Sequence, residues 1–127
     1  MSNIDDINSS IDNINKKYID ETVGITGAEP FTAALGLFRT QVSEYIMSCR
    51  TYFRKGEYEE AGRELHKIKG AASSIGLSRL AVKAKEMELS LLEKREKYSF
   101  DPEIAAFNEL VVQDEATLGQ YLKSFPE

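Results

Sequence analysis

The chain has 127 residues, a formal net charge of −5 and a single cysteine. This length suits one domain with its own hydrophobic core, and one thiol excludes an internal disulfide. The negative charge argues against nonspecific binding to nucleic acid, and no apolar run is long enough to cross a membrane. The start of the chain also lacks the pattern of a secretory signal, so we expect a cytoplasmic protein.

Apolar residues recur at intervals of three and four, and no stretch alternates as a half-buried strand does, which predicts an all-α fold. Residues 1–20 are predicted to form an N-terminal capping helix, in which isoleucines keep this spacing at Ile4, Ile7, Ile11 and Ile14. The residues between them are poor helix formers, so this helix needs packing or a partner to hold it. Residues 21–29 are predicted to be a loop, because two glycines and several β-branched residues interrupt a helical run.

Four amphipathic helices are predicted in residues 30–56, 57–75, 78–97 and from 101 onward. Pro30 suits a first helical turn, Gly56 and Gly76 suit helix ends, and Ser78 and Asp101 are the predicted N-caps of the third and fourth helices. Cys49 falls on the apolar face of the first of these helices and is predicted to be buried. The short connections favour an antiparallel up-down four-helix bundle over residues 21–127, with the N-terminal helix as an addition.

His66, the only histidine, lies in the second of these helices, within "RELHKIKGAASSIGLSRL". At about 100° per residue its apolar residues fall on the opposite face, so the imidazole is predicted to point into solvent. They are Ala61, Leu65, Ile68, Ala72 and Ile75. Gly62 and Gly70 lie one turn to either side of the histidine and Ser73 lies two turns on, so another protein could approach closely. Glycines also permit close helix crossing, although no helix is expected to cross this face.

Basic residues gather near the histidine. Lys69 shares its face, and six basic side chains against one acid lie between positions 63 and 85: Arg63, Lys67, Lys69, Arg79, Lys83 and Lys85. Such a run suggests an anionic partner, while a solvated face of mixed charge is the simpler alternative.

The chemistry open to His66 is narrow. One histidine and one buried cysteine are too few for a metal site, no base and nucleophile are expected to share a pocket, and no glycine-rich phosphate loop is present. A nucleophilic imidazole that accepts a phosphoryl group from a partner fits best, because phosphoryl transfer needs in-line approach and positive charge more than a pocket. Lys69 would balance the charge of the phosphorylated ring.

The segment "HKIKGAASSIG", residues 66–76, resembles the motif of histidine-containing phosphotransfer (HPt) domains, with Ile68 in place of the usual leucine. The similarity extends over about residues 20–95. It implies that His66 accepts phosphate from a receiver-domain aspartate and passes it to another receiver, that Lys69 stabilises the phosphoryl group and that Gly70 provides clearance. Gly62, Arg63, Lys67 and Ser73 are further candidates for clearance or docking.

The implied partners are response-regulator receiver domains and a hybrid histidine kinase in a multistep phosphorelay, with this chain as a monomeric phosphocarrier. It would need no cofactor or metal of its own, because the receiver supplies the magnesium and the acidic pocket. Two alternatives stay open: a helical scaffold whose histidine is never modified, and the phosphoacceptor domain of a larger histidine kinase.

Overall fold

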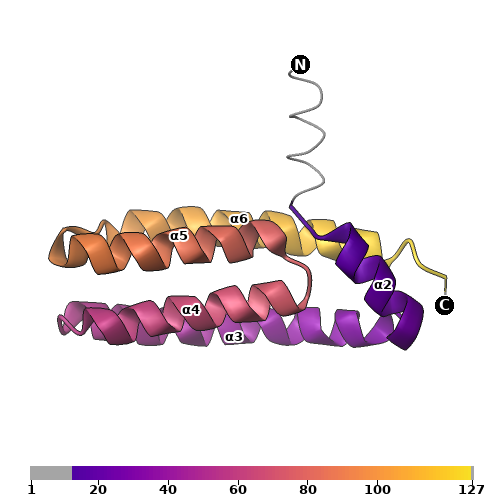
Figure 1. Ribbon diagram of the computed structural model, residues 1–127, viewed down its shortest axis with the longest axis horizontal. Helices are drawn as coiled ribbons and strands as arrows, with labels where there is room; N and C mark the ends of the chain where they lie inside the picture. The colour runs from indigo at the N-terminus through magenta and orange to yellow at the C-terminus, as the bar shows by residue number, and fades with distance from the viewer. Residues whose placement is uncertain (1–12, 127) are drawn as a thin grey trace, which may run out of the picture.

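The computed structural model describes residues 13–126, which form five α-helices and one short 3-10 helix. The helices are α2 (Lys16–Thr26), α3 (Glu29–Arg54), α4 (Tyr58–Ser74), α5 (Ser78–Lys94) and α6 (Phe100–Leu122), and the 3-10 helix η1 (Arg95–Lys97) follows α5. Figure 1 shows α3 to α6 running alternately in opposite directions, with α2 lying across one end of the bundle. The described part of the chain contains no strand, which confirms the predicted all-α bundle.

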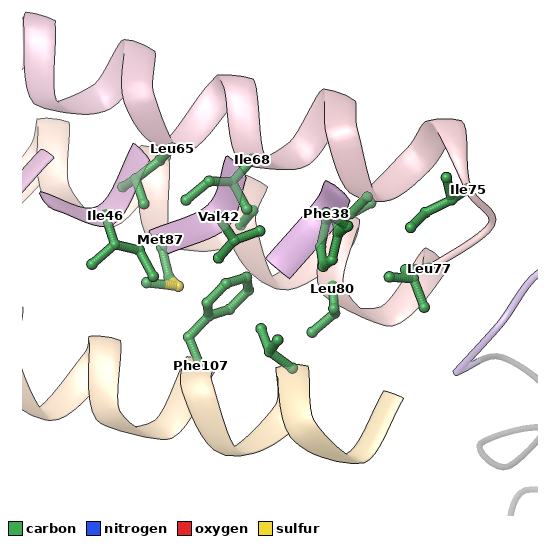
Figure 2. Packing of buried hydrophobic residues seen from close by; sticks show 14 of the residues in the cluster. Phe38, Val42, Ile46, Leu65, Ile68, Ile75, Leu77, Leu80, Met87 and Phe107 are labelled. Carbon is green, nitrogen blue, oxygen red and sulfur yellow. The ribbon is translucent and has the colours of Figure 1, made fainter. Parts of the chain in front are cut away.

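Each of the four long helices contributes one apolar face to a shared core. Figure 2 shows these faces meeting between the helices, with Phe38 and Val42 of α3, Ile68 of α4 and Phe107 of α6 close together. Each large side chain that is fully buried in this way contributes about 1.5–3 kcal/mol. The predicted core residues of α4 are all buried, and so is Cys49, whose thiol pKa is raised by burial to about 12.

The helix boundaries follow the sequence signals, with some shifts. Pro30 lies in the first turn of α3, and Gly56 adopts a φ of 76° just after the end of that helix. The structure places the N-cap of α6 at Ser99 rather than Asp101, so the predicted cap lies inside the first turn. There its negative charge still faces the positive end of the helix. The N-cap of α5 is Leu77, one residue before the predicted Ser78, and α5 itself ends at Lys94, before η1.

The prediction of a loop over residues 21–29 is wrong, because α2 continues to Thr26. Tertiary packing overrides the weak helix propensity of this segment: Ile19 is fully buried, and Val23 packs against the core. The hydroxyl groups of Thr22 and Thr26 each donate a hydrogen bond to the carbonyl four residues earlier. Helix α2 therefore runs across residue 20, where we placed the boundary of the capping helix, and the predicted positions Ile4, Ile7 and Ile11 lie outside the described residues.

Helix α2 is held against the end of the α4–α5 hairpin. The amide of Asn15 donates to the carbonyl of Gly76 at 2.8 Å, and the Tyr18 hydroxyl donates to the carbonyl of Ser74 at 2.9 Å. Gly76 has a φ of 77°, and a Cβ at this position would lie 2.7 Å from the side chain of Ile19. Glycine is thus required both by the backbone conformation and by the close approach of α2.

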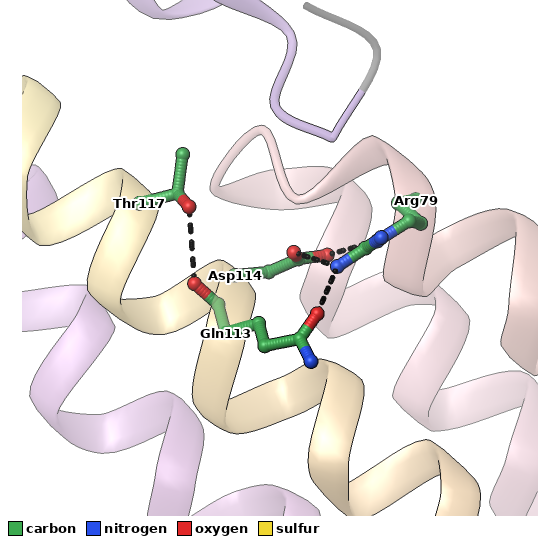
Figure 3. A network of polar contacts seen from close by, with 4 residues as sticks. All are labelled: Arg79, Gln113, Asp114 and Thr117. Carbon is green, nitrogen blue, oxygen red and sulfur yellow. Dashed lines mark hydrogen bonds and ion pairs between the residues drawn. The ribbon is translucent and has the colours of Figure 1, made fainter. Parts of the chain in front are cut away.

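The start of α5 is tied to α6 by an ion pair with a buried carboxylate (Figure 3). Arg79 donates to both oxygens of Asp114, at 2.6 and 3.0 Å, and to the side-chain oxygen of Gln113 at 3.0 Å. Asp114 is 0% exposed, so its charge depends on this bidentate contact. The hairpin that carries the histidine is therefore fixed to α2 at one end and to α6 along its side.

Candidate functional site

His66 lies on the exposed face of α4, opposite the buried residues Leu65 and Ile68. Its side chain is 60% exposed, as the helical phase predicts. A side chain presented on a helix has a better defined position than one on a loop, and the backbone of this helix is held by its buried apolar face. The ring is therefore attached to a well packed helix and is accessible to a partner.

A carboxylate from the next helix contacts the ring, and the sequence analysis missed it. Oε1 of Glu88, on α5, lies 3.3 Å from Nδ1 of His66, and the Glu88 side chain is only 15% exposed. An ionised carboxylate can only accept a hydrogen bond, so this contact favours the tautomer of the neutral ring that carries its proton on Nδ1. In that tautomer the lone pair is on Nε2, the ring nitrogen that does not face the carboxylate.

Gly62 does not serve as predicted. It is buried, and a Cβ at this position would lie 3.3 Å from the side chain of Leu92 on α5. Its missing side chain makes room for the neighbouring helix and not for a partner protein. The structural reason is that α5 packs against the edge of the face on which the histidine stands, where we expected no other helix.

Three other predicted residues remain accessible around the ring. Gly70 and Ser73 are exposed, and a Cβ at Gly70 would find open space with no atom within 4 Å. Lys69 is half-buried, and it forms no ion pair within the described range 13–126. Lys69 and Ser73 line a groove between α4 and α5, together with Val82 and Lys85. The site thus combines an exposed imidazole, open space at Gly70 and an ammonium group that forms no ion pair with a carboxylate of the described residues.

Lys67 and Arg63 lie on the other side of the histidine, away from α5. Nζ of Lys67 is 2.7 Å from a carboxylate oxygen of Glu64 and 5.7 Å from the ring centre of Tyr45 on α3. The hydrogen bond to Glu64 raises the pKa of Lys67. Arg63 is exposed and lies 3.6 Å from Glu60. Lys67 is therefore already paired and directed towards α3, and Arg63 forms only a surface ion pair.

The six basic residues of the predicted run do not share one surface. Arg79 binds the buried Asp114, and Lys83 lies 3.9 Å from Glu103 of α6, so both face the α5–α6 side. Only Lys69 and Lys85 line the groove beside the histidine. The positive charge available to an anion at His66 is therefore smaller and more localised than the sequence suggested.

Among positions 13–126, no group of three or more His, Cys, Asp or Glu side chains is arranged to hold a metal ion. Within the same range no helix combines the length and the apolar character needed to cross a bilayer.

Comparison with protein-family models gives a match to the Hpt domain over residues 33–120. The match extends from α3 into the last turn of α6 and includes His66, whereas α2 lies outside it. Neither the curated proteins nor the solved structures contain a significant match to the chain.

Proposed function

The chain belongs to the Hpt domain family, and from this premise we propose that His66 is its phosphoryl acceptor in a multistep His-Asp phosphorelay. Members of the family are histidine phosphocarriers that interact with receiver domains and kinases. The observation that carries the proposal for this chain is the exposed ring whose Nδ1 faces the carboxylate of Glu88 at 3.3 Å. This contact supports an unprotonated Nε2 on the only histidine in the chain.

In the proposed reaction, the Nε2 lone pair of His66 attacks the phosphorus of an aspartyl phosphate on a receiver domain. The N–P bond forms as the P–O bond to the aspartate breaks, and the aspartate leaves as a carboxylate. The ring keeps its Nδ1 proton and becomes positively charged, with Glu88 beside it to balance that charge. A second receiver reverses these steps, and the magnesium ion that both transfers require belongs to the receivers.

Lys69 is proposed to bind the phosphoryl oxygens, because it is the half-buried lysine of α4 that lines the groove beside the ring. We propose that the absence of a side chain at Gly70 lets a receiver loop reach the histidine, since a Cβ at this position would face open space. Ser73 would border the same approach.

The test is a transfer assay with a phosphorylated receiver domain as donor. We expect one phosphate per chain, stable to base and labile to acid, as a phosphohistidine should be. A protein that takes no phosphate from any cognate receiver would instead behave as an unmodified scaffold, and the proposal would fall.

Replacing Lys69 with alanine should slow phosphotransfer about tenfold, because one charge-assisted contact to the phosphoryl group contributes roughly 1–2 kcal/mol at a partly exposed site. Single-turnover kinetics with a phosphorylated receiver measure the effect. Lys67→Ala is the matched control, since it removes a neighbouring ammonium group that is already paired with Glu64. Equal rates for the two variants would remove Lys69 from the site.

Replacing Glu88 with glutamine should lower the transfer rate roughly threefold to tenfold, because the hydrogen bond that fixes the ring proton is worth about 1 kcal/mol. An amide can donate to the ring as well as accept from it, so both tautomers become populated. Nitrogen NMR of the ring should show this change directly. Glu86→Gln is the control, as Glu86 lies two residues earlier on α5 and its side chain is 64% exposed. A ring tautomer that is the same in Glu88→Gln and wild type would contradict the assigned role.

A further inference from the structure

A groove between α4 and α5, which begins one helical turn from His66, is lined by charged side chains from both helices. Lys69 and Ser73 come from α4, and Val82, Lys85 and the largely exposed Glu86 come from α5. Lys85 was part of the basic run in the sequence, but neither the motif nor the helical phase of α4 assigns it a role. Its place in the groove brings it to the same side of the histidine as Lys69.

Lys85 also shares a neighbour with the imidazole. Its Nζ atom lies 3.9 Å from Oε1 of Glu88, the same oxygen that lies 3.3 Å from Nδ1 of His66. The ammonium group and the ring are therefore held around one carboxylate oxygen. The lysine side chain is 45% exposed, so its head group can move within the groove while its stem stays on α5.

The charge that a phosphoryl group brings is too large for one lysine. A phosphoryl group carries about −1.5 to −2 charges near neutral pH, and the Glu88 carboxylate adds another negative charge close to the ring. A ring protonated at Nδ1 offsets one of these charges and Lys69 offsets a second. One more cation is needed for a neutral site, and among the described residues Lys85 is the remaining lysine that lines the groove. Glu86 lines the groove as well, but its side chain is 64% exposed and lies 4.0 Å from the ammonium group of Lys83.

We infer that Lys85 is a second phosphoryl-binding residue, so that a phosphate on His66 lies between the ammonium groups of Lys69 on α4 and Lys85 on α5. This inference rests on the proposed function of His66. Before transfer Lys85 stays near Glu88, and after transfer it moves to the phosphoryl oxygens, which present a higher negative charge density. The step breaks and forms no covalent bond.

The chain offers a matched control two residues earlier on the same helix. Lys83 is 32% exposed, has the same charge, and lies 4.0 Å from Glu86 and 3.9 Å from Glu103 of α6. Its ammonium group is thus directed to another side of α5. A Gln substitution at Lys83 changes the net charge as a Gln substitution at Lys85 does, but Lys83 is not one of the residues that line the groove.

The test measures the equilibrium between phosphorylated receiver and phosphorylated full-length chain at concentrations where little complex is present. This equilibrium depends on how well each protein holds the phosphoryl group and not on how tightly the two proteins dock. Lys85→Gln should shift it about threefold to tenfold towards the phosphorylated receiver, as expected for loss of a charge-assisted contact that is partly exposed. Lys83→Gln should leave the equilibrium unchanged, and Lys85→Arg should restore most of the wild-type value.

Each other outcome is decisive. If Lys85→Gln raises only the KM for the receiver and the equilibrium stays the same, Lys85 contacts the receiver and the inference is wrong. Equal shifts in Lys85→Gln and Lys83→Gln would mean a general charge effect, which also overturns it. If the wild-type chain takes no phosphate, the proposed function and this inference both fail, whereas normal wild-type transfer with an unaffected Lys85→Gln variant removes the inference alone.

Discussion

His66→Gln should take no phosphate from a phosphorylated receiver, while its fold and thermal stability stay close to those of the wild type. Glutamine keeps a polar side chain of similar length but has no nitrogen with a free lone pair for attack on phosphorus. The wild-type side chain is 60% exposed and its one described polar contact is with Glu88, so little stabilisation is lost. A transfer assay and a thermal melt followed by circular dichroism measure the two effects.

Lys67→Gln serves as the control for the substitution itself, since it places the same residue type next to the histidine on α4. It should accept phosphate at nearly the wild-type rate. Phosphate incorporation into His66→Gln at the wild-type level would show that another residue is the acceptor.

Arg79→Leu should lower the free energy of unfolding by about 3 kcal/mol, because it leaves the carboxylate of Asp114 buried without a counter-charge. Asp114 is 0% exposed, while the Arg79 side chain is 32% exposed, so we expect the lower part of the range found for broken buried pairs. This loss is a large share of the roughly 5–15 kcal/mol that holds a domain folded. Urea unfolding monitored by circular dichroism gives the value.

Two further variants separate the ion pair from simple packing. Lys83→Leu removes a cation of α5 whose partners are at 3.9–4.0 Å, and it should cost less than about 1 kcal/mol. The double variant Arg79→Leu with Asp114→Leu should recover much of the lost stability, because no buried charge remains. If Arg79→Leu alone lowers the free energy of unfolding by less than about 1 kcal/mol, the carboxylate of Asp114 does not depend on Arg79 for its stability in the folded protein.

Periodicity within a single helix was enough to predict which way His66 points. The apolar residues of α4 recur at intervals of three and four residues, and this spacing predicts which face of the helix is exposed without knowledge of the other helices. The same reasoning predicted the core positions of α4 and the burial of Cys49. The burial of Asp114 could have been predicted in the same way, because it lies three residues after Val111 and four before Leu118, at a position where the pattern requires an apolar residue.

Relations between helices could not be predicted in this way. The contact of His66 with Glu88 depends on the register of α4 against α5, which the pattern of neither helix determines. The same register brings Leu92 over Gly62, so this glycine makes room for α5 and not, as predicted, for a partner protein. Helix α2 extends beyond its predicted end for a related reason, since burial of Ile19 against Gly76 outweighs the local propensities.

The central claim is that Nε2 of His66 carries the phosphoryl group, and nitrogen NMR of the histidine-labelled chain tests it most directly. Because the chain has one histidine, every imidazole signal belongs to His66. Before transfer we expect the ring proton on Nδ1, and after addition of a phosphorylated receiver we expect coupling of Nε2 to phosphorus. Ring signals that do not change while the receiver loses its phosphate would contradict the account.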